Sequence, residues 1–138
     1  MNQKYEAPKF IKNKETRARY EKWLSRRASS HAKRDGVATQ MYKGRIHKAV
    51  ERSNGVDAYT GERLDWDLIS KYDNEEARKG GVGHWRRFKL LPSVDHVQKI
   101  SRPGQFRICG LRTNDAKGYM SIAELRAFCK KVLRYKKK

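Results

Sequence analysis

Two short stretches hold the residues of this sequence that are best suited to chemistry. Asp95 and His96 are adjacent, and Asn114 and Lys117 follow further along the chain. Histidine can act as a general base near neutral pH because its unperturbed pKa is about 6.5. A carboxylate and an amide oxygen suit Mg²⁺ or Mn²⁺, which complete their shells with water and phosphate. These residue types are the ones that metal-assisted hydrolysis needs, a base to activate water and oxygen ligands to bind a metal ion.

The elements that must position these side chains are a hairpin and a helix. Residues 88–97 are apolar and β-branched enough for a strand, in which Pro92 is tolerated only at an edge or a bulge. Residues 101–104 predict a turn, and residues 105–111 alternate as a second strand. Further on, Ser121 and Glu124 have the spacing of a helix-opening capping box. The helix that follows carries an apolar stripe, formed by Leu125, Phe128, Cys129, Val132 and Leu133.

The adjacency of Asp95 and His96 sets a geometric condition. Neighbouring residues of a regular strand point to opposite faces, so both can face one phosphate only where the strand ends or bulges. Pro92, four positions before His96, makes such an irregularity expected. The enzymatic interpretation requires the side chain of His96 to lie near the cation rather than in the packed interior.

The segment 91–117, which contains PSVDH and NDAK, resembles the HNH (ββα-metal, His-Me finger) endonucleases. In that family a β-hairpin and the following helix hold one divalent metal, and members often carry a Tyr-x-Gly turn upstream, here Tyr59-Thr60-Gly61. The resemblance implies that His96 is the general base, that the Asp95 side chain turns to the metal, and that Asn114 is the second ligand.

The sequence departs from the family pattern at two points. The middle family residue is usually Asn, and Gln105 stands at that position, where its longer amide could take the same orienting role. The paired CxxC zinc knuckles of many members are missing, so no zinc is expected and packing must hold the fold. Two alternatives stay open: Asp115 competes with Asn114 as a ligand, and Asn114 could instead be a turn or helix-cap residue.

The charge of the chain points to a polyanionic partner. Lys and Arg number 34 against 15 Asp and Glu, a net charge of +19. Residues 1–53 carry +10, residues 54–84 carry −3 and residues 85–138 carry +12. Two basic flanks around a mildly acidic middle suit a nucleic-acid partner gripped from two sides. The partner we expect is DNA, double-stranded, and not a small molecule or a membrane, although the charge itself does not separate DNA from RNA. The candidate phosphate contacts are Lys117, Arg107, Arg112, Arg86 and Arg87.

The remaining expectations concern organisation. We expect one α+β domain over residues 1–138, mainly helical: a basic arm (1–13), a basic helical region (14–55), an acidic connector (56–84), a ββα-metal core (85–135) and a basic tail (136–138). Within the helical region, helices are expected over 14–33 and 37–52. Asp65 is expected to cap a helix, and the glycines at 80–83 indicate a flexible segment. The fourteen aromatic residues, three Trp, seven Tyr and four Phe, argue for a folded core.

The compartment and the rival function also follow from the sequence. Cys109 and Cys129 are interpreted as two buried free thiols in a reducing cytoplasm, and neither a secretory signal nor a membrane span is recognisable. One active site cuts one strand, so duplex cleavage would imply a homodimer or two visits. The alternative function is a non-catalytic basic nucleic-acid-binding protein, ribosome- or nucleoid-associated, which accounts for the charge equally well.

Overall fold

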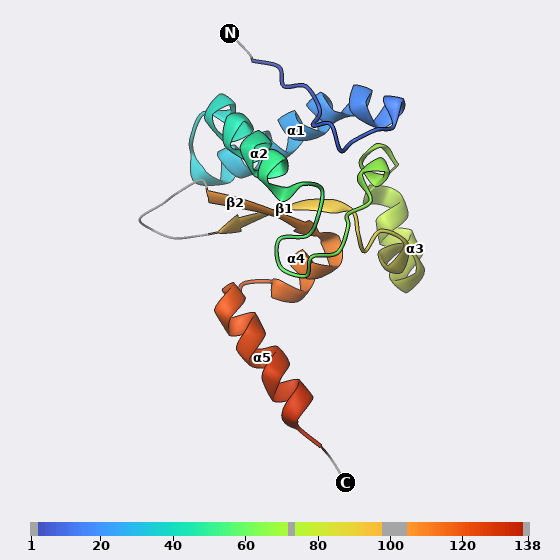
Figure 1. Cartoon of the computed structure of the whole chain (residues 1–138), viewed down its shortest axis with the longest axis vertical. Helices are drawn as coiled ribbons and strands as arrows, with labels where there is room; N and C mark the ends of the chain where they lie inside the picture. Colours follow the sequence, from blue (N-terminus) through green and yellow to red (C-terminus); the bar gives the residue numbers. More distant parts are fainter. Residues whose placement is uncertain (1–2, 72–73, 98–104, 137–138) are drawn as a thin grey trace.

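A computed structural model describes residues 3–71, 74–97 and 105–136 (Figure 1). The chain is α+β and mainly helical, with a small antiparallel hairpin followed by a helix, as the sequence predicted. In chain order, the elements of this part are α1 (Lys14–Asp35), α2 (Thr39–Ser53), the 3-10 helix η1 (Trp66–Ser70), α3 (Asn74–Arg87), β1 (Pro92–Val97), β2 (Gln105–Gly110), α4 (Leu111–Lys117) and α5 (Ile122–Arg134).

The two long N-terminal helices begin and end at residues suited to those positions. The side chain of Asn13 accepts a hydrogen bond from the backbone N–H of Thr16 and so caps α1. Gly36 ends α1 with φ 67°, a conformation that costs glycine little. Asn54 ends α2 with φ 51°, in the left-handed region. Helix α1 extends two residues beyond its predicted end, to Asp35, and this extension matters for the site.

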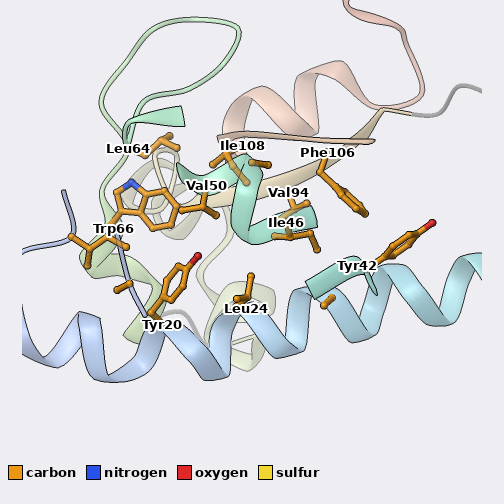
Figure 2. Close-up of a cluster of buried hydrophobic side chains, with 14 of the residues drawn as sticks. Tyr20, Leu24, Tyr42, Ile46, Val50, Leu64, Trp66, Val94, Phe106 and Ile108 are labelled. Atoms are coloured by element: carbon orange, nitrogen blue, oxygen red, sulfur yellow. The ribbon is translucent and has the colours of Figure 1, made fainter. Parts of the chain in front are cut away.

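The main core lies between these helices and one face of the hairpin (Figure 2). Helices α1 and α2 pack against each other, and α2 also packs on β2. The opposite face of the hairpin is occupied by α4 (Figure 1). The hairpin is therefore sandwiched between a helical layer and a short helix. The buried side chains that meet in the core include Tyr20, Leu24, Tyr42, Ile46, Val50, Val94, Phe106 and Ile108.

The hairpin is regular along its described length. Asp95 pairs with Arg107, and His96 pairs with Phe106, in antiparallel register. Pro92 is the first residue of β1, where its missing N–H disturbs the ladder least. The prediction of an irregularity near His96 is therefore wrong, because Pro92 lies at the start of β1 and does not disturb the strand. The predicted turn at 101–104 lies outside the described residues.

Two local predictions in the connector are corrected. The glycines at 80–83 lie within α3 rather than in a flexible segment. The helix breaks only at Gly81 (φ 55°, ψ −137°), since glycine tolerates the left-handed region. Asp65 precedes η1, but its side chain makes no capping hydrogen bond, and the segment forms a short 3-10 helix. Within the described part of the chain, no helix is both long and apolar enough to cross a membrane.

Candidate active site on the two faces of the hairpin

The carboxylate of Asp95 lies on the α4 side of β1 and is buried, with 6% of the residue exposed. Its Oδ2 accepts a hydrogen bond of 2.5 Å from the hydroxyl of Tyr59. The ammonium of Lys117 lies 3.2 Å from the same oxygen and 3.4 Å from Oδ1. A negative charge inside the fold is thus balanced by one cation and one hydroxyl donor.

Tyr59 is held beneath the hairpin by a tight turn that Asp57 organises. The Oδ1 atom of Asp57 accepts hydrogen bonds from the backbone N–H groups of Tyr59 (2.7 Å) and Thr60 (3.0 Å). Its Oδ2 accepts one from the N–H of Gly110 (2.8 Å), at the end of β2. Burial opposes ionisation, yet these hydrogen bonds lower the pKa of Asp57 below its usual value. Asp57 therefore fastens the predicted Tyr-x-Gly turn to the start of α4.

Asn114 joins the same face of the hairpin. Its Nδ2 donates to the Oγ of Ser93 at 3.0 Å, and Ser93 lies two residues before Asp95 on β1, so both point to one side. The amide nitrogen is the donor in this contact, so the atom of Asn114 that could bind a cation is the carbonyl oxygen Oδ1. Asn114 lies inside α4, whose N-cap is Gly110, so it is not a helix cap.

The donor set on this face suits a small hard cation. Asp95 and Asn114 offer carboxylate and amide oxygens, and Lys117 already places a positive charge against Asp95. Among the described residues, no group of three or more His, Cys, Asp or Glu side chains could hold a metal ion. A cation here would therefore depend on these two side chains, with water and phosphate completing its shell. The rival ligand Asp115 is exposed and accepts a hydrogen bond from the indole of Trp85 at 3.2 Å.

His96 lies on the opposite face of β1, against α1 and α2. Its Nε2 is 3.3 Å from Oδ2 of Asp35, and its side chain is only 7% exposed. The ring stacks on Phe106, with centroids 5.0 Å apart. Its Nδ1 is buried and has no hydrogen-bond partner within the part of the chain that the structure describes. The imidazole is thus fixed through one nitrogen and unpartnered at the other.

Asp35 is the functional candidate that sequence reasoning missed. Besides facing His96, its Oδ2 accepts a hydrogen bond of 2.5 Å from the hydroxyl of Tyr42. Burial, together with this bond and the charge of Asp35, raises the pKa of Tyr42 to about 12, so the phenol stays a donor. In the sequence, Asp35 stands only as part of an Asp-Gly break after a helix. No local signal distinguishes it, because its partners come from α2 and β1.

His31 is the other titratable group beside His96. The two rings meet edge to face, with centroids 5.5 Å apart. Burial, followed by the nearby charges of Arg34 and His96, lowers the pKa of His31 to about 4. Its Nδ1 is also buried and unpartnered among the described residues. His31 is therefore neutral near neutral pH and adds no charge beside His96.

The structure thus brings Asp95, Asn114 and Lys117 together and leaves His96 on the other side of the strand, packed in the interior. It therefore does not meet the geometric condition that the enzymatic interpretation sets on His96. The hairpin has two strands, so the outer edge of β1 faces no further strand within the described residues. Asp95 and His96 project to either side of that edge. Both side chains are buried, with 6% of Asp95 and 7% of the His96 side chain exposed, so a phosphate at this edge could reach them only after a rearrangement.

The remaining predicted residues fall at several places. Gln105 alternates with Phe106, so it shares the face of Asp95 and does not lie on the face of the His96 ring. Arg107 is exposed directly across from Asp95. Arg112 is half-buried and paired with the carboxylate of Glu62.

Two further arginines lie at the C-terminal end of α3. Arg86 and Arg87 are both exposed. The guanidinium of Arg87 lies over the ring of Phe88, 5.1 Å from its centroid. The indole of neighbouring Trp85 contacts Asp115 of α4. This end of α3 therefore lies near the α4 side of the hairpin.

Comparisons with protein-family models, with curated proteins and with solved structures found no match to this chain.

Proposed function

We propose that this protein is a metal-dependent endonuclease that hydrolyses DNA phosphodiester bonds. The observation that carries the proposal is that two neighbouring residues of β1, Asp95 and His96, each have a charged partner. On one face of the strand, the buried carboxylate of Asp95 lies against the ammonium of Lys117. On the other face, the imidazole of His96 is held by Asp35. A hydrolase acting on a phosphodiester needs a base, an electrophilic cation and compensation for the charge of the leaving oxygen.

Asp95 and Asn114 are the residues that would hold Mg²⁺ or Mn²⁺. Bound there, the ion would polarise the scissile phosphate and stabilise the negative charge that develops on it. Tyr59 keeps one oxygen of Asp95 in place through its hydroxyl. Lys117 would exchange its contact with Asp95 for the phosphate, where its ammonium acts as a point charge.

His96 is proposed to take the proton from the attacking water. Asp35 is suited to hold the proton of Nε2, since carboxylates commonly fix one imidazole tautomer in this way. The other nitrogen, Nδ1, is then the proton acceptor, and it is the nitrogen that has no partner among the described residues. Tyr42 donates to Asp35 and so fixes the carboxylate. Asp35 and Tyr42 are positioning residues in this scheme.

The proposal requires two rearrangements when DNA binds. Lys117 must leave Asp95, and the buried Nδ1 of His96 must become accessible to water at the edge of β1. Such changes are in keeping with the long or incomplete catalytic contacts of many substrate-free enzymes. A net charge of +19 supplies the attraction to DNA that would drive them.

Nicking of supercoiled plasmid tests the proposal. We expect cleavage with Mg²⁺ or Mn²⁺, none with excess EDTA, and a loss of at least about 100-fold in rate for His96→Ala. Asp95→Asn should lose activity as well, whereas Asp115→Asn, a matched change at an exposed carboxylate of α4, should retain it. DNA affinity measured on each variant separates lost chemistry from lost binding. Equal nicking by wild type and His96→Ala would contradict the proposal.

A second candidate, a non-catalytic nucleic-acid-binding protein, is favoured by a specific observation. Asp95 is already neutralised by Lys117, and His96 is packed against Phe106 on the other face. If neither rearrangement occurs, only a basic surface is left to act on DNA. Protein that shifts DNA in gels but leaves plasmid intact under every divalent metal would establish this reading and refute the nuclease.

A further inference from the structure

Helix α5 presents an apolar stripe that no described part of the chain covers. The helix stands apart from the other elements in Figure 1, and none of its residues is buried. Phe128, Val132 and Leu133 are 55%, 60% and 78% exposed. Leu125 and Cys129 lie on the same side, because residues three and four apart share one face of a helix. The stripe therefore runs almost the whole length of α5.

An isolated helix of this length needs a packing partner. Helices shorter than about 12–15 residues are marginal in water by themselves, and α5 has 13. Its capping box, formed by Ser121 and Glu124, stabilises only the first turn. Most helical stability in proteins comes from packing of the apolar face. The stripe is thus expected to be covered when the protein works.

We propose that the stripe of α5 pairs, antiparallel, with the same stripe on a second copy of this chain. The charges beside the stripe are self-complementary. Glu124 and Lys131 are seven residues apart and so lie on the same side of the helix, next to Phe128. In an antiparallel pair centred on Phe128, the first turn of one helix lies level with the last turn of the other. Glu124 then lies beside Lys131 of the partner subunit, and two-fold symmetry repeats the contact.

The mixed charge of this flank favours a second copy over an acidic protein or an anionic membrane. An acidic protein or an anionic membrane would place negative charge against Glu124, whereas a second copy places Lys131 there. The other border, with Arg126 and Lys130, repels its own copy. Pairing should therefore be weak, concentration-dependent and stronger in salt. A single helix pair is also smaller than the roughly 1,200 Å² of a standard interface.

Sedimentation velocity of the full chain over a range of concentrations tests the proposal. In roughly 0.5 M salt, where the Debye length is only about 4 Å, we expect the mass to rise from monomer towards dimer with concentration. Phe128→Glu should keep the protein monomeric. Ala127→Glu, which adds the same charge on the opposite side of α5, should still dimerise. Lys131→Glu, which sets two carboxylates together, should weaken association severalfold.

Circular dichroism and thermal melting of each variant exclude unfolding as the cause of a lost dimer. A wild-type chain that stays monomeric at every concentration would overturn the proposal, as would Phe128→Glu dimerising like wild type. Binding of a monomeric wild type to vesicles of phosphatidylserine, abolished by Phe128→Glu, would overturn it in favour of a membrane surface. The result does not depend on whether the protein cleaves DNA.

Discussion

The buried pair of Lys117 and Asp95 gives the most direct test of the site. We consider Lys117→Met, which removes the ammonium and keeps an unbranched apolar side chain in its place. In the wild type the side chains of Lys117 and Asp95 are 10% and 8% exposed, and the two charges are 3.2 Å apart. In the variant, the hydroxyl of Tyr59 is the one close donor that Asp95 keeps among the residues that the structure describes.

The magnitude follows from the distance and the burial. At 3.2 Å and an effective dielectric constant of about 20, the attraction between unit charges is about 5 kcal/mol, before the cost of desolvating them. Leaving one member of a buried pair without its partner typically costs about 3–5 kcal/mol of folding free energy. The double variant Asp95→Asn/Lys117→Met has no unpaired charge, so it should be more stable than Lys117→Met alone.

Magnesium makes the prediction specific to a cation site. A divalent ion can take the place of the missing ammonium, so Mg²⁺ should stabilise Lys117→Met much more than wild type. Binding at about 100 times the dissociation constant adds about 2.7 kcal/mol. The assay is urea unfolding with and without Mg²⁺, on the wild type, on Lys117→Met and on the double variant, in which no Mg²⁺ effect is expected.

Either of two outcomes would refute this reasoning. A cost below about 1 kcal/mol for Lys117→Met would show that the pair is exposed to water and worth no more than a surface ion pair. An equal effect of Mg²⁺ on wild type, Lys117→Met and the double variant would show that Asp95 binds no cation.

Three further predictions concern the supports of the site. Burial lowers the pKa of His31 to about 4, so between pH 6.5 and 4 this histidine binds a proton in the unfolded chain but not in the folded one. The free energy of unfolding should therefore fall as the pH drops from 6.5 to 4, by up to about 1.4 kcal/mol per pH unit. Urea titrations of His31→Phe should show a flatter dependence on pH. Asp57→Ala, which frees three backbone N–H groups, should cost about 3 kcal/mol or more in the same assay, and a cost near zero would contradict its role as the fastening of the turn. Tyr42→Phe, which removes a hydroxyl from Asp35, should lower the nicking rate without changing the salt dependence of DNA affinity; unchanged nicking would argue against the positioning role of Asp35.

The sequence by itself determined the local elements of this protein. The alternation of residues 105–111 predicted β2, which ends one residue earlier, at Gly110. The Ser121–Glu124 spacing predicted the capping box of α5, which the structure confirms. The helix boundaries at Asn13 and Asn54 are local in the same sense, because a capping side chain and a left-handed backbone preference act over one turn. The α+β class followed from these elements. All of these signals act between residues close together in the chain.

Tertiary structure alone decided which side chains meet. Asp95 and Lys117 were expected near one phosphate, but their direct ion pair depends on how α4 docks on the hairpin. The hydrogen bond from the Tyr59 hydroxyl to Asp95 likewise depends on how the turn that carries Tyr59 docks there. Asp35 reaches His96 because α1 runs past its predicted end and packs across the hairpin. Strand geometry, on the other hand, fixes that Asp95 and His96 diverge. The sequence could predict that neighbouring strand residues point to opposite faces, but not whether a bulge interrupts the strand. The observed register shows no bulge, and that regularity depends on the partner strand.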